Sequence, residues 1–311
     1  MINFRFHLVS LVAVFLALAV GIVMGYGVLG QPTVDTLQHR IDTVEANAEA
    51  RRHENDALKS QVEQLDTQTT ALGPFAVTNR LSSSHLLVVA VRGIDGDTMT
   101  NTVQLARRAG ADAPGILWLE HNWLLNSADE RKALGTAIGT NATKPSTLRE
   151  RGLRALAGRL EGGLSPTGDL LRSLTDAGFV SYEGVRDVGN RPLSELGGAG
   201  TTALLVVGAD GSIPGTQVVV PFARGSLLAQ LPVVVGEAYR QKDKGPGRGA
   251  LVGLVRSDQS LAKQIATVDD LDRPSGPIVA LLALADLERG TVGHYGFGEG
   301  AAAAVPSWWQ P

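Results

Sequence analysis

The chain opens with a long apolar run, and its pattern then changes to a seven-residue repeat. Residues 8–29 (LVSLVAVFLALAVGIVMGYGVL) are 22 positions without a charged side chain. As a helix this run would be roughly 33 Å long, which is enough to cross a hydrocarbon core of ~30 Å. We therefore expect a single transmembrane helix at residues 8–29, preceded by a short tip at residues 1–7.

The charges that flank this run favour one orientation. Arg5 and the N-terminal amine precede it, and no acidic residue occurs before Asp35. The positive-inside rule then places residues 1–7 in the cytoplasm and the chain after the helix outside the cell membrane. The alternative is a cleaved signal peptide, since 17–19 (ALA) fits a small-x-small cleavage pattern. The apolar run extends well beyond that pattern, so we expect an uncleaved anchor.

Small residues within the run have the spacing of a helix-packing face. Ala17, Gly21 and Gly25 lie four positions apart, so they share one side of a helix. Such a face allows two membrane helices to approach closely. We expect it to pair two copies of the chain. The alternative is a chance spacing in a chain rich in glycine and alanine.

A seven-residue repeat begins at Val34 and predicts a parallel coiled-coil stalk at residues 31–73. Asn55 occupies an a position, where asparagine fixes the register of parallel dimers at a cost in stability. The residues that we expect in the dimer seam are Val34, Leu37, Ile41, Val44, Ala48, Asn55, Leu58, Val62, Leu65 and Leu72.

Charged positions beside this seam favour the same arrangement. Arg40 at g faces Glu45 at the following e position, and Glu54 faces Lys59 in the same way. Opposite charges at this offset suit a parallel pair. We expect the helix to end at 73–74 (GP), because proline interrupts a helix. The alternative is a single amphipathic helix that packs back on the globular part of its own chain.

The rest of the chain alternates short apolar runs with amphipathic segments. We expect strands at 86–91, 115–119, 179–182, 203–207, 232–235 and 250–255, and helices at 98–109, 128–138, 147–160, 169–177, 217–230 and 260–265. The apolar run 277–287 fits either structure. This alternation predicts an α/β domain at residues 80–300 with a doubly wound, mostly parallel sheet. The close of the chain, 301–311 with Trp308 and Trp309, is expected to be a mobile tail.

Composition and motifs exclude several classes of function. The chain has 311 residues, a formal net charge of −3 and no cysteine. A net charge near zero gives no electrostatic argument for binding nucleic acid. A chain without cysteine has no disulfide, no cysteine-bound iron–sulfur cluster and no thiol nucleophile. The nucleotide motifs G-x-G-x-x-G and G-x-x-x-x-G-K-[ST] and the hydrolase motif G-x-S-x-G are missing at the strand ends. We therefore predict no cofactor, no catalytic residue and no enzyme activity.

Polar residues follow three of the predicted strands. Asp95 and Asp97 come after the first strand, Glu120 and His121 after the second, and Asp210 after the strand at 203–207. Ligands of open α/β sheets bind at the carboxyl ends of the strands, so these side chains can converge on one cation or one hydroxylated ligand. The alternative is that the aspartates cap or turn the chain, with Asp97 at the start of the following helix.

Two later segments each allow a second interpretation. The glycine-rich stretch 293–300 (GHYGFGEG) can close over a ligand or form a packed C-terminal loop. The stretch 267–272 (TVDDLD) places three carboxylates within four residues, which suits a hard cation or a solvated turn.

Three stretches of the chain resemble the actinobacterial MctB family, whose members are called copper transport proteins. They are 1–25, which includes HLVSLVAVFLALA, 266–272 (ATVDDLD) and 293–298 (GHYGFG). The resemblance in layout extends over essentially the whole chain. It implies one of two roles. One is copper resistance, as a pore across the mycobacterial outer membrane; the other is septal cell separation, as for the corynebacterial member SteB, which works with SteA in the control of peptidoglycan hydrolysis.

The residues fit these two implied roles unequally. Copper prefers Cys, Met and His ligands, whereas this chain has no Cys, three Met and six scattered His. An outer-membrane pore would need alternating strands of ~10 residues. We therefore expect a dimeric, single-pass scaffold of the cell membrane that acts with a septal membrane partner resembling SteA and with a peptidoglycan hydrolase. The alternatives are a copper efflux protein, with copper as its cargo, and an extracytoplasmic ligand-binding domain.

Overall fold

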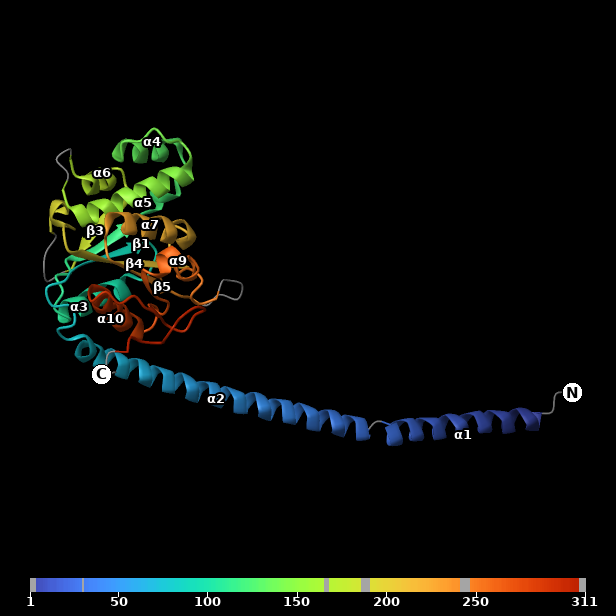
Figure 1. The fold of residues 1–311 in the computed structure, drawn as a ribbon. Helices are drawn as coiled ribbons and strands as arrows, with labels where there is room; N and C mark the ends of the chain where they lie inside the picture. The colour runs from blue at the N-terminus through green and yellow to red at the C-terminus, as the bar shows by residue number, and fades with distance from the viewer. Residues whose placement is uncertain (1–3, 30, 165–167, 186–190, 241–246, 308–311) are drawn as a thin grey trace. The chain divides into compact units, whose positions relative to one another are not determined.

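The computed structural model describes residues 4–29, 31–164, 168–185, 191–240 and 247–307 (Figure 1). The chain forms two compact units, Met1–Leu65 and Asp66–Pro311. The first unit consists of helix α1 (Phe4–Leu29) and most of helix α2 (Gln31–Val77). The second contains the last turns of α2 and an α/β domain.

Helix α1 confirms the single apolar helix expected at the N-terminus. Its segment Phe4–Gly27 is 24 residues long, and within the described chain it is the one helix with the length and composition to cross a membrane. Ala17, Gly21 and Gly25 are exposed, and a Cβ at either glycine would meet no atom of its own chain within 4 Å. The face that these residues form is thus open to a partner, and its pairing and the orientation of the helix remain predictions.

Helix α2 continues four residues beyond the expected end at Gly73. Pro74 lies inside its last turn, and the Thr78 hydroxyl donates a hydrogen bond of 2.6 Å to the Pro74 carbonyl. One proline removes one backbone donor, and the last turn still closes because its end is capped in this way.

The predicted seam residues of the stalk lie on an exposed helix. Side chains are at least half exposed at Leu37, Val44, Leu58, Val62 and Leu65 and nearly so at Ile41, and Ala48 and Asn55 are also exposed. Val34 lies outside the residues whose side chains are described. Pairing of two such helices remains a prediction.

The α/β domain is built on one seven-stranded sheet, with the strand order β3-β2-β1-β4-β5-β6-β7. All neighbours are parallel except β2 and β3, which are antiparallel. The strands are β1 (His85–Val91), β2 (Gly115–Leu119), β3 (Val180–Gly184), β4 (Thr201–Gly208), β5 (Val233–Ala238), β6 (Ala266–Val268) and β7 (His294–Tyr295). The expected mostly parallel α/β domain is therefore confirmed.

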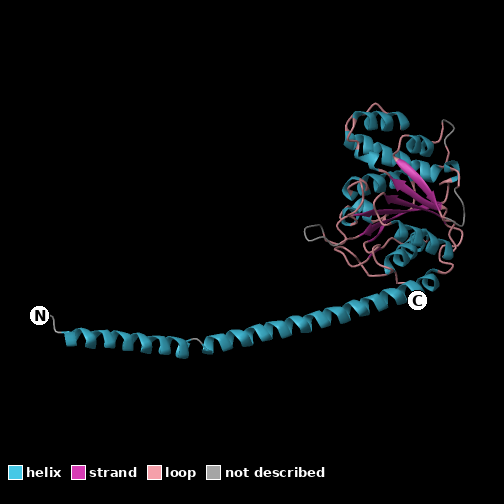
Figure 2. Cartoon of the chain, turned by 180° about the vertical axis from the view of Figure 1, so that it is seen from behind, coloured by secondary structure: helices cyan, strands magenta, loops and turns pink. Residues whose placement is uncertain are grey.

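Helices cover both faces of the sheet (Figures 1 and 2). Helices α3 (Gly96–Arg108) and α10 (Ser275–Glu288) lie on one face, and α5 (Pro145–Gly162) and α7 (Val219–Ala229) lie on the other. The shorter helices are α4 (Ala128–Ala137), α6 (Leu170–Asp176), α8 (Gly253–Arg256) and α9 (Gln259–Ala262), with 3₁₀ turns η1 (His121–Leu124), η2 (Leu193–Glu195) and η3 (Gly215–Gln217). The doubly wound topology itself remains a prediction.

The prediction of a strand at 250–255 is wrong, because this segment is a turn followed by α8. The buried Glu237 carboxylate accepts hydrogen bonds from the backbone N–H groups of Gly249, Leu251 and Val252 at 3.2, 2.9 and 3.2 Å. Three backbone N–H groups can point at one carboxylate only if the backbone turns around it. In a strand, successive N–H groups point in opposite directions. The short strands β6 and β7 were not expected, and the ambiguous run 277–287 is helical.

Candidate functional site

The strand order reverses between β1 and β4, and the loops after these two strands close on each other. The chain proceeds from β1 to β2 on one side and later returns to β4 on the other. Such a reversal is where open α/β sheets bind ligands. Gly93 has φ +103°, and a Cβ there would collide with the Asp210 carbonyl oxygen. The Ser212 N–H also donates to the Arg92 carbonyl at 2.6 Å, so backbone fills part of this crevice.

A cavity of 250 Å³ remains at the carboxyl ends of these strands. It is lined by Ile94, Asp95, Thr98, Gly208, Asp210, Ala238, Tyr239, Arg240, Leu271 and Asp272. Two of the five predicted ligand residues, Asp95 and Asp210, therefore line the same cavity. Ile94, Thr98 and Gly208 are neighbours of these two residues in sequence, whereas the other lining residues come from the end of β5 and from the segments that follow β5 and β6.

Both of these carboxylates already have partners. Asp95 accepts hydrogen bonds from the Thr98 N–H at 2.9 Å and from its hydroxyl at 2.5 Å, so Asp95, rather than Asp97, is the N-cap of α3. These bonds lower the pKa of Asp95 below its ordinary value. Asp210 pairs with Arg240 at 2.8 Å. Within the cavity, Asp95 is thus held in its ionised form as a helix cap, and the charge of Asp210 is balanced by Arg240.

The other three predicted ligand residues lie apart from this cavity. Asp97 is exposed in the first turn of α3, and His121 is exposed at the start of η1. Glu120 accepts hydrogen bonds from Arg92 at 2.9 Å and from the Ser181 hydroxyl at 2.5 Å. The five residues predicted after the strands are thus distributed over separate places.

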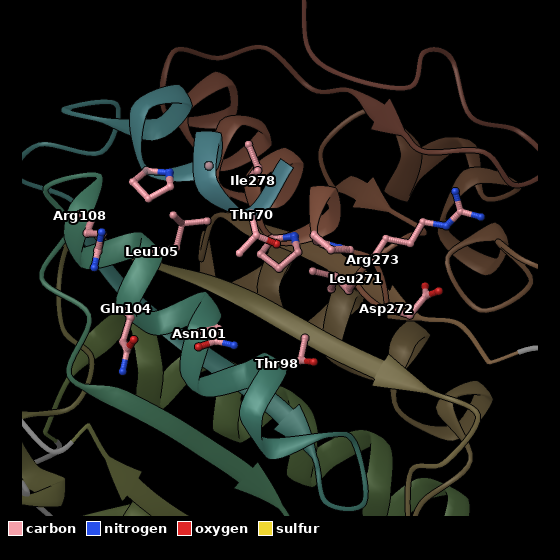
Figure 3. A pocket seen from close by; sticks show the side chains of 14 residues that line it. Thr70, Thr98, Asn101, Gln104, Leu105, Arg108, Leu271, Asp272, Arg273 and Ile278 are labelled. Atoms are coloured by element: carbon pink, nitrogen blue, oxygen red, sulfur yellow. The ribbon is translucent and has the colours of Figure 1, made fainter. Parts of the chain in front are cut away.

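A larger groove of 420 Å³ lies beside this cavity (Figure 3). Its walls are α3, the start of α10 and the last turns of α2. It is lined by Thr70, Gly73, Pro74, Thr98, Asn101, Gln104, Leu105, Arg108, Leu271, Asp272, Arg273, Pro274, Pro277 and Ile278. Thr98, Leu271 and Asp272 line both hollows. The groove was not predicted, because three elements that are remote in sequence form it.

The groove has a polar wall and an apolar floor. Thr98, Asn101, Gln104 and Arg108 are spaced by three or four residues along α3, so they form one polar stripe. Leu105, Leu271, Pro277 and Ile278 supply the apolar contacts. The groove thus offers both hydrogen-bonding groups and apolar surface to a bound molecule.

The acidic stretch 267–272 is neither a solvated turn nor a cation site. Asp269 is fully buried and pairs with Arg256 at 2.9 Å. It also accepts hydrogen bonds from the backbone N–H groups of Phe297 at 2.7 Å and Gly298 at 3.0 Å. Gly296 has φ +123°, and a Cβ there would collide with the Asp269 carboxylate. The stretch 293–300 is therefore a packed loop held down by a buried ion pair.

The other two carboxylates of this stretch have separate partners. Asp272 makes a two-bond pair with Arg248, at 2.7 and 2.8 Å. Asp270 is buried and accepts a hydrogen bond of 3.2 Å from the Ser275 hydroxyl, while its second oxygen has no hydrogen-bond partner among the described residues. Burial raises the pKa of Asp270. Within the described ranges, no group of three or more His, Cys, Asp or Glu side chains is arranged to hold a metal ion.

Three of the side chains that copper would prefer are engaged in other contacts. Met99, a residue of α3, is fully buried. His294 contacts the Thr267 hydroxyl at 3.0 Å and the Ala262 carbonyl at 3.1 Å, and burial lowers its pKa. His85 contacts Asp112 at 3.3 Å. Met99 and His294 thus contribute to the packing of the domain, whereas the His85 side chain is 60% exposed.

Comparison with known proteins points to one family over nearly the full chain. Residues 1–306 match the family model described as "Copper transport outer membrane protein, MctB". The chain is 29% identical over 325 residues to the copper transporter MctB of Mycobacterium tuberculosis (strain ATCC 25618 / H37Rv), covering 99% of this chain and 100% of that protein. It is 27% identical over 322 residues to the copper transporter MctB of Mycobacterium leprae (strain TN), covering 97% and 98%.

Proposed function

Because the chain belongs to the MctB family, we propose that it is a membrane-anchored protein of the cell envelope that acts in copper transport. The names of its relatives support the copper role. The apolar helix α1 supports the anchor. The charges around this helix favour a cytoplasmic N-terminus and an α/β domain outside the cell membrane.

Within this role we propose that the chain is a scaffold that dimerises through α2. The single observation that carries the proposal is the exposure of the apolar side chains of the predicted seam along α2, from Leu37 to Leu65. Exposed apolar side chains at heptad spacing are stabilised when a second such helix covers them. The offset pairs Arg40–Glu45 and Glu54–Lys59 favour a parallel partner.

We propose that copper is moved by an assembly that this scaffold organises. The groove between α3, α10 and the end of α2 offers a partner protein a polar stripe above an apolar floor. Met99 is buried and His294 is held by hydrogen bonds, and within the described residues no group of three or more His, Cys, Asp or Glu side chains is arranged to hold a metal ion, which supports a contribution through partners. Copper is then the cargo of the assembly.

Septal cell separation is the second candidate function. An anchor followed by a long helix and a domain with a groove suits a protein that presents a partner-binding surface in the cell-wall space. Its partners would be a septal membrane protein resembling SteA and a peptidoglycan hydrolase. A third candidate, an extracytoplasmic ligand-binding domain, rests on the cavity that Asp95 and Asp210 line.

A genetic complementation experiment separates the first two functions. A strain that lacks the gene would receive either the wild-type chain or the variant Leu58→Asp, which places a charge in the seam. We expect the wild type, and not the variant, to restore growth at elevated copper. Ser60→Asp, on the outer side of the repeat, is the matched control and should restore growth. Unchanged copper tolerance on deletion, with chained or unseparated cells, would contradict the copper role and favour the septal one.

A further inference from the structure

The last turns of α2 belong to the globular unit and have one face packed on it. Val77 is fully buried, and a Cβ at Gly73 would lie 3.1 Å from the Ile278 side chain of α10. Thr70 and Pro74 line the groove from the same side (Figure 3). In the heptad count that begins at Val34 these residues occupy b, e and f positions. The packed side of the helix is therefore not the side that carries the a and d residues.

The other face of the same turns is apolar and uncovered. The side chains of Leu72 and Phe75 are 63% and 79% exposed, and Ala76 is exposed as well. The same heptad count places Leu72 at d, Phe75 at g and Ala76 at a. Pro74 is at f, outside the seam, so the missing backbone donor does not interrupt it. The seam pattern thus continues beyond the point where the sequence predicts the stalk to end.

We propose that Leu72, Phe75 and Ala76 form a self-association surface that packs against the same residues of a second copy of the chain. The inference rests on the dimer of the proposed function and extends it from the stalk onto the globular unit. A second copy is the occupant that fits, because the three residues keep the phase of the repeat. The charge pairs Arg40–Glu45 and Glu54–Lys59 complement each other between parallel copies in that same phase.

This surface leaves the groove free. Leu72 and Ala76 point away from the side of the helix where Thr70 and Pro74 line the groove. A dimer formed through the first pair therefore buries no groove residue of α2. Each dimer would present two grooves, so a partner with two docking segments gains avidity.

The absence of cysteine allows a direct test in the full-length chain. Single cysteines introduced at Ala76 and at Leu58 would be the only thiols in the protein. The variants Ala76→Cys and Leu58→Cys would be expressed in membranes and treated with a short bismaleimide. The matched controls are Thr70→Cys, on the groove side of the same turns, and Ser60→Cys, on the outer side of the stalk. All four positions are exposed, so the substitutions leave the core untouched.

We expect Ala76→Cys and Leu58→Cys to give a product of twice the mass, in several-fold higher yield than their controls. If Leu58→Cys cross-links and Ala76→Cys does not exceed Thr70→Cys, the extension onto the globular unit is overturned while the proposed stalk dimer stands. If neither seam variant exceeds its control, both the extension and the dimer are overturned.

Discussion

Asp269 and Arg256 form a buried ion pair, and their side chains are 0% and 5% exposed. Arg256 also donates to the carbonyls of Tyr295 and Glu299 at 2.9 Å, so the pair joins β6 to the C-terminal loop. A buried pair is costly to form, and removing one partner leaves the other charge uncompensated. The stability of this loop therefore depends on a contact between residues far apart in sequence.

Asp269→Ala should lower the free energy of unfolding by about 3–5 kcal/mol, the usual cost of breaking a buried ion pair. Denaturant unfolding of the full-length chain in detergent, followed by the fluorescence of the buried Trp118 and Trp123, measures this change. The matched control is Glu150→Ala, which removes the half-exposed partner of Arg154 and should cost less than about 1 kcal/mol. Equal costs for the two variants would contradict the structural role of Asp269.

The sequence predicts which carboxylates follow strands, but it does not predict the side chains with which they pair. Asp95 and Asp210 were found because each follows a strand, and strand order brings such positions together. The partners of Asp269 and Asp272 were not found, since Arg256 and Arg248 reach them through tertiary folding alone. A run of three carboxylates therefore left a hard cation and a solvated turn open, whereas the folded chain supplies guanidinium groups to Asp269 and Asp272.

At the scale of elements, hydrophobic patterning identified the long segments and failed on the short ones. Strands β1, β2 and β4 are buried apolar runs, and the sequence predicts them within two residues at either end. Strands β6 and β7 have three and two residues, too few for a period to be read. The run 250–255 is apolar in the manner of a strand, but the Glu237 carboxylate imposes a turn on it.

Strand β7 should make the stability of the domain sensitive to acid through His294. Its pKa is lowered by burial and by the nearby Arg256, so the unfolded chain takes up a proton more readily than the folded one. Stability from this group is fully present above the ordinary pKa of about 6.5, and it is lost as the pH falls towards the folded pKa.

The variant His294→Gln should flatten this dependence. In the wild type the free energy of unfolding should fall by at most about 1.4 kcal/mol per pH unit on acidification below pH ~6.5 through this one group. Denaturant unfolding of both proteins between neutral and mildly acidic pH compares the slopes. If the wild type and His294→Gln lose stability with falling pH at the same rate, the pKa of His294 is not lowered in the folded chain, and the prediction is wrong.

At the scale of the whole molecule, sequence patterning identified an apolar anchor, a long heptad helix and an α/β domain in this order. The structure confirms the apolar helix and the mostly parallel sheet. The groove could not be predicted, because its walls come from three elements that are joined only by packing. Function is the least predictable part, since no motif of the chain specifies a reaction and its family is named for copper.

The central claim is that the chain serves copper transport as a dimeric scaffold and does not itself hold the metal. Calorimetric titration of the purified full-length chain with Cu(I), and separately with Cu(II), tests this claim most directly. We predict no stoichiometric binding at micromolar copper. Tight binding at a fixed ratio of copper to chain would contradict the account, and would make the chain itself the copper carrier.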